Sequence, residues 1–490
     1  MESSGQAAAR SAQPQMPEHD PAQNPTQSLV RGIGLPQAVA LNLLEMIGVG
    51  PFITLPLVVA AMGGPQAMLG WLLGAVLALC DGMVWAELGA ALPEAGGSYI
   101  YLREIYGPRG GRLVSFLYVW QLALSAPLSI ASGCIGLAAY TGYLAPALRQ
   151  PLGPLTHLPA WMPVVRDHSV PLAMAACWLA AALLNRGIRG AGRIALLLAA
   201  GVLAALGWVL WAGATHFHPA LALSFPPNAF HLGRPFFFGL GAATLLASYD
   251  YWGYYAVCFV GGEVRAPQRT IPRAVLLSIV LVAALYLAMN LSVLGVLPWR
   301  QIVDMRQGGP GHSVMAVFME RLYGAAAGRW MAALIVWTAF ASIFSLLLGY
   351  SRVLYAAARD GNFFASLGRL HPRHQVPQRA LLWLAAAASL ACLFRLVDVI
   401  AALVVLRLLL QFLLQQAGLL RLRRHRPELF TGFRMRLYPL PVWIAIAGSL
   451  FVLLARHGSL RQMALAAGFT LAGVIVFALR KASAPPATPK

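Results

Sequence analysis

The sequence predicts an all-α integral membrane protein with about twelve transmembrane helices. The first observation is composition: of the 490 residues, 59% are apolar and only 11% are charged, and the mean hydropathy is +0.68. Because soluble proteins are about a quarter charged, this excludes an ordinary soluble enzyme, a disordered chain and a nucleic-acid-binding domain. The other two observations are a series of long apolar runs joined by short loops, and the placement of arginine in those loops.

A helix that crosses the hydrocarbon core of a bilayer needs roughly 20 mostly apolar residues. Runs of this kind lie at 33–61, 66–91, 112–143, 169–186, 191–215, 235–262, 274–297, 329–357, 379–395, 398–420, 437–455 and 460–480. The runs are continuously apolar and lack the alternation of lipid-facing barrel strands, so we expect helices.

Arginine is concentrated in every second loop, which predicts the orientation of the chain. With the N-terminus inside, the cytoplasmic loops contain Arg103, Arg109, Arg112, Arg186, Arg189, Arg265, Arg269, Arg273, Arg359, Arg369, Arg373 and the cluster from Arg421 to Arg436. The net charge of +20 therefore indicates anionic headgroups of a cell membrane, plasma or inner, and no nucleic-acid partner. Both termini are expected in the cytoplasm.

Composition divides the chain into one membrane domain, 31–481, and two tails. Residues 1–30 are rich in Ala, Gln, Pro and Ser and lack an apolar core, so we expect a flexible cytoplasmic tail rather than a signal peptide. Residues 482–490 form a similar flexible tail. No cofactor is expected, and the loosely spaced histidines of the 216–231 loop predict a solvated loop rather than a metal site.

The first apolar run is interrupted near its middle by Gly48, Gly50 and Pro51. Pro51 lacks a backbone N–H and clashes with the preceding helical turn, and glycine lets the chain leave helical geometry. Inside a bilayer, backbone groups freed in this way are tolerated only beside a cavity or within protein. We interpret the segment as a break that lines a site; the alternative is a kinked helix whose glycines pack against a neighbour.

A second interruption lies in the sixth run, where residues 247–255 include an acid, polar aromatic residues and a glycine. Asp250 lies near the middle of this run, and an acid at that depth costs at least ~2.5 kcal/mol on insertion scales. We therefore expect Asp250 to face a cavity and interpret it as part of a site. The alternatives are a structural ion pair and an aromatic belt at the membrane interface.

The two interruptions begin two similar halves, repeat one at 33–215 and repeat two at 235–420. Two halves whose first helices, helices 1 and 6, are both broken indicate an inverted repeat, typical of secondary transporters with a site at the membrane midplane. The N-terminal end of a half-helix suits a carboxylate, and the C-terminal end suits an ammonium group. The geometry therefore favours a zwitterionic amino acid.

Five segments occur in order along the chain: Gly48-Val49-Gly50, Ala86 to Gly107, Gly262 to Ala274, Ala358 to Gly361 and Leu422 to Glu428. Together they resemble the amino acid permeases of the amino acid–polyamine–organocation superfamily over most of residues 33–480. The resemblance implies a 5+5 inverted repeat with two extra C-terminal helices at 437–480. It also implies secondary active transport of amino acids or related amines.

The resemblance further implies which residues contact the substrate. By position they are Ile47, Gly48, Val49, Gly50, Ser248, Tyr249, Asp250, Tyr251 and Trp252, with a further carbonyl near Met46. The backbone of the glycine-containing break would bind the carboxylate. Carbonyls just before that break and in the second interruption would bind the ammonium group, and the aromatic residues would form a side-chain pocket and a gate.

Some proton-coupled members of the superfamily carry a lysine in the fifth span, whereas this chain has lysine only in its C-terminal tail. Glu45 and Asp250, one beside each interruption, are the candidates for coupling: they relay protons, or they add negative field for a cationic substrate such as a polyamine. Ser342 and Ser345 lie near positions where sodium-coupled relatives place cation ligands, although helix packing is the preferred interpretation.

Four further charged residues lie at or near membrane depth. Glu87 and Glu263, at the inner ends of their spans, are expected either to join an inner gate through loop arginines or to serve packing and capping. Arg407 lies inside the tenth span and needs a partner that the sequence does not identify; Asp398 lies on the same helix.

We therefore expect an amino acid permease that works by alternating access. Proton coupling is the first expectation, sodium coupling the second and exchange the third, and polyamines or other organic cations are the rival substrate class. Isolated acids instead of rings of charge disfavour a channel, and the sequence contains no motif that supports an enzyme.

Overall fold

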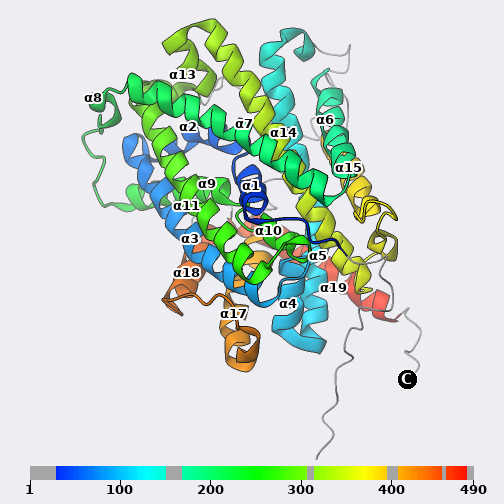
Figure 1. The fold of residues 1–490 in the computed structure, drawn as a ribbon. Helices are drawn as coiled ribbons and strands as arrows, with labels where there is room; N and C mark the ends of the chain where they lie inside the picture. The colour runs from blue at the N-terminus through cyan, green and yellow to red at the C-terminus, as the bar shows by residue number, and fades with distance from the viewer. Residues whose placement is uncertain (1–28, 151–167, 306–313, 394–406, 455–458, 483–490) are drawn as a thin grey trace, which may run out of the picture.

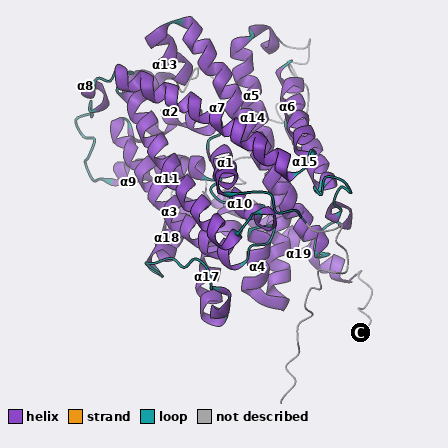
Figure 2. Cartoon of the chain, in the orientation of Figure 1, coloured by secondary structure: helices purple, strands orange, loops and turns teal. Residues whose placement is uncertain are grey.

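The computed structural model describes residues 29–150, 168–305, 314–393, 407–454 and 459–482. In these ranges the chain consists of helices and connecting loops, with β-type pairing confined to two isolated bridges (Figures 1 and 2). The expected tails lie outside the described residues apart from 29–30 and 482, and so does Asp398.

The helices follow the predicted runs closely. In chain order they are α1 Leu35–Met46, α2 Gly50–Met62, α3 Met68–Ala91, α4 Ser98–Tyr106, α5 Arg112–Leu144, α6 Ser169–Leu184, α7 Ile188–Thr215, α8 Pro219–Ala222, α9 Arg234–Tyr251, α10 Ala256–Phe259, α11 Pro267–Leu294, α12 Trp299–Asp304, α13 Val314–Tyr323, α14 Ala325–Arg359, α15 Gln378–Ala391, α17 Leu414–His425, α18 Leu440–Leu454 and α19 Ser459–Ala482. A π-helical segment, η9, covers Leu408–Leu413 and leads into α17.

Among the described residues, five helical segments are long and apolar enough to cross a membrane. They are Pro65–Ala91, Arg112–Leu144, Ile188–Thr215, Pro267–Leu294 and Ala325–Arg359. Helices α1 and α2 meet the same test as one span that is bent by 48°. The all-helical, multi-pass architecture is therefore as predicted, while α6, α18 and the apolar part of α19 are shorter.

Helix α1 lies near the centre of the bundle (Figure 1) and packs against α7, α11 and α14. Several helices within residues 33–215 pack against a helix within residues 235–420. In each of these pairs, the two helices belong to apolar runs that have the same position in the order of runs along their half of the chain. Such contacts join α2 to α9, α3 to α11, α5 to α14 and α6 to α15. The broken segments are thus enclosed by long helices from both halves.

Large apolar side chains also cover the outside of the bundle. Trp211 is 68% exposed, Trp330 69% and Leu454 71%. In water such an apolar surface would cause aggregation, but the hydrocarbon core of a bilayer is as apolar as these side chains. The exposed apolar surface therefore agrees with a protein that lies in lipid.

Candidate functional site

The first break separates α1 from α2. Helix α1 ends at Met46, and α2 begins at Gly50, with Pro51 in its first turn. Proline is tolerated there because the first N–H groups of a helix have no intrahelical acceptor. Gly48 and Val49 lie between the two helices, so the main chain presents the C-terminal end of one helix and the N-terminal end of another at the same place.

The second break follows α9, which ends at Tyr251. Trp252 is extended, and Gly253 has a φ of +124°, a conformation that favours glycine. A Cβ atom at Gly253 would lie 2.7 Å from the backbone of Glu45 and Met46. The absence of a side chain therefore lets the second break approach the end of α1 directly.

Tyr286 of α11 ties the two breaks together. Its hydroxyl donates to the carbonyl of Met46 at 2.8 Å and lies 3.4 Å from the carbonyl of Asp250. The sequence did not identify Tyr286, because a single tyrosine in an apolar span gives no indication of its partner. Asn42 was missed for the same reason; its amide accepts from the Val257 N–H at 2.9 Å and joins α1 to α10.

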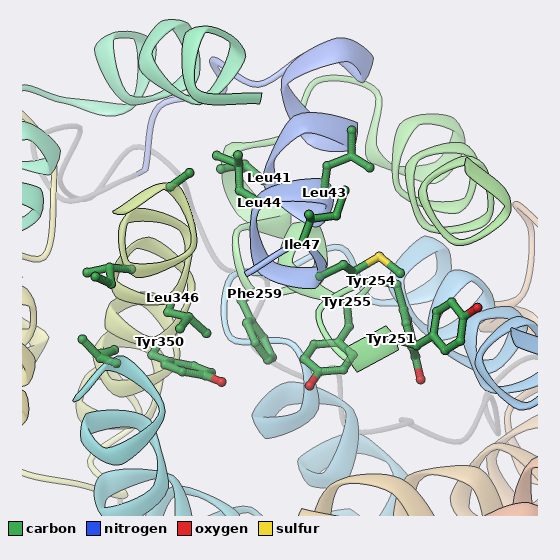
Figure 3. Packing of buried hydrophobic residues seen from close by; sticks show 14 of the residues in the cluster. Leu41, Leu43, Leu44, Ile47, Tyr251, Tyr254, Tyr255, Phe259, Leu346 and Tyr350 are labelled. Atoms are coloured by element: carbon green, nitrogen blue, oxygen red, sulfur yellow. The ribbon is translucent and has the colours of Figure 1, made fainter. Parts of the chain in front are cut away.

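A cavity of about 220 Å³ lies between the breaks. It is lined by Glu45, Met46, Gly48, Val49, Gly50, Pro51, Ile53, Thr54, Ser129, Ser132, Gly133, Gly136, Tyr249, Asp250, Trp252, Tyr255, Ser342, Leu346, Tyr350 and Arg407. Figure 3 shows Tyr255 and the α14 residues Leu346 and Tyr350 near the end of α1. The two breaks, α5, α14 and the start of η9 together enclose a space of the size of a small molecule.

Two carboxyl groups in this cavity have an oxygen without a hydrogen-bond partner among the described residues. Asp250 is 3% exposed; Thr54 donates to its Oδ2, and its Oδ1 has no partner. Glu45 is 9% exposed, and its Oε2 has no partner. Buried carboxylate oxygens normally have partners, so both acids have bonding capacity available for an occupant.

Arg407, whose partner the sequence left open, lies in the same wall. Its Nη2 donates to the hydroxyl of Tyr350 at 3.1 Å and to the hydroxyl of Ser129 at 3.3 Å. Its guanidinium carbon lies 5.5 Å from the ring centre of Trp252. No ion pair within 4 Å joins Arg407 to Glu45 or Asp250 in the described part of the chain, although all three line one cavity.

The other expected site residues are divided between the cavity and its surroundings. Gly48, Val49, Gly50, Tyr249 and Trp252 line it, whereas Ile47 and Tyr251 are fully buried and are not among its lining residues. Tyr251 packs instead against Trp71 and Tyr286. Ser248 lines a neighbouring, mostly apolar cavity of about 350 Å³ between α3, α9 and α18.

The two serines of α14 differ in their contacts. Ser342 lines the cavity, and a Cβ atom at Gly48 would lie 3.1 Å from its hydroxyl. Ser345 donates to the carbonyl of Leu41 at 2.9 Å and thereby joins α14 to α1. Helix packing as the role of these serines stays a prediction.

Glu87 and Glu263 are both buried and paired with arginine. Glu87 lies 2.8 Å from Nε of Arg423 and accepts from the N–H of Met435 at 3.0 Å. Glu263 makes two hydrogen bonds with Arg352, at 3.1 and 3.2 Å. The sequence suggests a loop arginine as the partner of Glu263. The structure shows instead an arginine inside α14.

Comparison with known proteins adds the family context. A family model described as amino acid permease matches residues 33–479. The chain is similar to the serine/threonine exchanger SteT of Bacillus subtilis, 27% identical over 87% of this chain and 91% of the relative. It is also similar to human Asc-type amino acid transporter 1, at 28% over 84% and 75%, and to the branched-chain amino acid permease BcaP of Lactococcus lactis, at 28% over 83% and 86%.

Proposed function

The chain belongs to the amino acid permease family, and from that premise we propose that it carries an amino acid across the cell membrane by alternating access. The observation that supports this most strongly is the cavity of about 220 Å³ between two helix breaks. Such a cavity exposes helix ends of both polarities to one small ligand. Its occupant in this proposal is an amino acid.

The proposed fold is a 5+5 inverted repeat followed by two further helices, about twelve spans in all. The packing of α2 on α9, α3 on α11, α5 on α14 and α6 on α15 supports it. Two halves related by a pseudo-twofold axis bring equivalent elements together near that axis, as the two copies do in a symmetric dimer. We also propose that both termini face the cytoplasm, because arginine is concentrated in every second loop and arginine-rich loops normally face the cytoplasm.

In the proposed binding mode, the substrate carboxylate meets the backbone of Gly48, Val49 and Gly50 at the start of α2. The ammonium group meets the side of the cavity that carries the carbonyl end of α1 and Asp250. Tyr249 and Trp252 contact the substrate side chain and act as an aromatic gate. Ile47, Ser248 and Tyr251 support this wall from outside the cavity.

The proposed coupling ion is a proton. Glu45 and Asp250 place two acids in a cavity with one arginine, so a zwitterion entering alone would leave one uncompensated negative charge in a medium of low dielectric constant. A proton that enters with the substrate neutralises this remaining negative charge. Sodium is a weaker candidate, because the Ser345 hydroxyl is engaged with the backbone of α1 and only Ser342 lines the cavity.

Exchange of one amino acid for another is the alternative mode, and it is favoured by the similarity to a serine/threonine exchanger. A polyamine or other organic cation is the alternative substrate, favoured by the two acids beside the breaks.

The inner gate in this proposal is built by Glu87 and Glu263 with their arginines. On the same side, the N–H of Ile33 donates to the carbonyl of Glu263 at 3.0 Å, and the N–H of Arg265 donates to the carbonyl of Ile33 at 2.8 Å. These contacts join the segment before α1 to the segment before α11. Opening toward the cytoplasm requires them to separate.

The proposed function is tested by uptake into proteoliposomes that contain the purified full-length protein. A panel of radiolabelled amino acids and amines is offered with and without an inward pH gradient, and with and without unlabelled amino acid inside. Saturable uptake of an amino acid that rises with the pH gradient supports the proposal. Uptake that requires internal amino acid supports exchange, and uptake restricted to putrescine or spermidine supports the polyamine alternative.

A further inference from the structure

Three charged side chains are present among the residues that line the cavity between the helix breaks: Glu45, Asp250 and Arg407. They come from α1, α9 and the residue that precedes η9. The three lining tyrosines, at 249, 255 and 350, are neutral at physiological pH. The net charge of the wall therefore depends on two carboxyl groups and one guanidinium.

Arg407 is the member of this set whose charge does not vary. A guanidinium does not lose its proton in proteins, and the hydrogen bonds to Ser129 and Tyr350 and the contact with Trp252 hold it in place. Both hydrogen bonds use Nη2, so Nε and Nη1 make none within the described residues.

The two acids, in contrast, each keep an unpartnered oxygen, Oε2 of Glu45 and Oδ1 of Asp250. With both ionised, the wall carries a net charge of −1 in the presence of Arg407 and would carry −2 without it. With one coupling proton bound, the net charge of the wall is zero in the presence of Arg407 and −1 in its absence. A zwitterion matches the neutral wall, whereas a basic amino acid or a diamine matches the negative one.

We propose that Arg407 determines the charge class of the substrate: by offsetting one of the two acids, it makes the cavity accept zwitterionic amino acids and reject basic amino acids and diamines. This inference rests on the proposed function, in which one proton accompanies the substrate. It makes Arg407 a specificity-determining residue and excludes the polyamine alternative for the wild-type chain.

The test compares uptake of neutral amino acids, serine and leucine, with uptake of lysine, arginine and putrescine for four forms of the full-length protein. Wild type is expected to prefer the neutral amino acids. Arg407→Gln is expected to raise the ratio of basic to neutral uptake by about tenfold or more, because a unit charge is lost at contact distance. Arg407→Lys keeps the charge and is expected to keep the wild-type preference, even where its overall rate falls.

The double variant E45Q/R407Q distinguishes the effect of the lost charge of Arg407 from the effect of its lost hydrogen bonds. It removes one negative and one positive charge, so the wall returns to its wild-type net charge while the hydrogen bonds of Arg407 remain lost. We expect the ratio of basic to neutral uptake to return to within about threefold of wild type. A purely structural role for Arg407 predicts that the double variant stays at least as impaired as Arg407→Gln.

Each outcome is decisive. A ratio unchanged by Arg407→Gln in a protein that remains monodisperse overturns the proposal, and so does a double variant that keeps the shifted ratio. Wild-type preference for lysine or putrescine also overturns it, while leaving transport itself intact. If wild type takes up none of the compounds, the result is a different one: it overturns the proposed function, and the proposed role of Arg407, which rests on that function, is overturned too.

Discussion

At the scale of single residues, the close approach of the two breaks depends on Gly253. Its φ is +124°, and a Cβ atom added there would lie 2.7 Å from the α1 backbone, so the position leaves no room for a side chain. We expect Gly253→Ala to reduce uptake at least about tenfold, because the break must move away from Glu45 and Met46. Proteoliposome uptake measures this, and Gly207→Ala is the control, since a Cβ atom at Gly207 meets nothing within 4 Å.

If Gly253→Ala transports at the wild-type rate, the contact between the breaks is not needed for function. A loss that appears equally in Gly207→Ala would instead indicate general sensitivity of the helices to substitution.

Asp250 carries the pH dependence in this account. Thr54 holds one carboxylate oxygen, and the other is free to bind a proton beside the substrate; Glu45 and Arg407 are the charged groups that share its cavity. Wild-type uptake should rise as the external pH falls, because a proton enters with the substrate. In Asp250→Asn the remaining Glu45 carboxylate is offset by Arg407, so a zwitterion needs no accompanying proton and residual uptake should be flat between about pH 5.5 and 8.

The matched control for this prediction is Asp304→Asn, which removes an exposed acid of α12 far along the chain from both breaks. Its uptake should keep the wild-type pH profile. Wild-type pH dependence in Asp250→Asn would transfer the coupling role to another group.

Residues such as Asp250 could be found from the sequence, because an acid in an apolar run is costly unless it serves a site or a partner. Tyr286, Arg352 and Asn42 could not, since a hydrogen bond between helices far apart in the chain leaves no trace in local composition. The partners of Arg407 were missed for the same reason. The sequence indicates where polar groups are buried, whereas packing decides what they contact.

At the scale of elements, α11 holds the broken helices in register through Tyr286. Tyr286→Phe removes the hydroxyl that donates to the Met46 carbonyl while keeping the ring packed on Trp71 and Tyr251. We expect a loss of roughly 1 kcal/mol in stability, the usual value for one hydrogen bond. We also expect uptake to fall several-fold, because both breaks lose a shared anchor.

Thermal unfolding followed by intrinsic fluorescence and initial uptake rates measure the two effects. Tyr323→Phe is the control, because Tyr323 is 44% exposed at the end of α13. A Tyr286→Phe protein with wild-type uptake would show that the breaks keep their positions without this hydroxyl.

Helix positions were predicted well, because length and continuous apolarity are properties of the chain itself. The break in the first span was predicted for a similarly local reason, the combination of Gly48, Gly50 and Pro51. The assignment of the expected residues to one substrate site stays a prediction. Ile47, Ser248 and Tyr251 are not among the residues that line the cavity between the breaks. For Ser248 and Tyr251 the reason is that a helix turns successive side chains by about 100°, so only some residues of α9 face that cavity.

At the scale of the whole molecule, the side that the proposed orientation places in the cytoplasm is held together by the buried pair of Glu263 and Arg352, which are 0% and 1% exposed. Glu263→Gln leaves an unpaired buried guanidinium, and breaking a buried pair in this way costs about 3–5 kcal/mol. We expect the inner side to open and Ile33, which is fully buried, to become accessible from that side.

Labelling of an I33C substitution by a membrane-impermeant maleimide, applied to oriented vesicles, measures this opening. The background is low because all five native cysteines are buried. Labelling should increase at least about fivefold in I33C/E263Q relative to I33C alone, whereas I33C/E320Q, altered at an exposed acid of α13, should label like I33C. Equal labelling in all three would show that the pair does not close this side.

The central claim is that one amino acid occupies the cavity between the two helix breaks, and an electron cryomicroscopy map determined with the best-transported amino acid of the uptake panel tests it most directly. We predict density between the backbone of Gly48–Gly50 and Asp250, with Arg407 and Trp252 in the same wall. Density confined to the neighbouring cavity between α3, α9 and α18, or unbroken helices through both segments, would contradict the account.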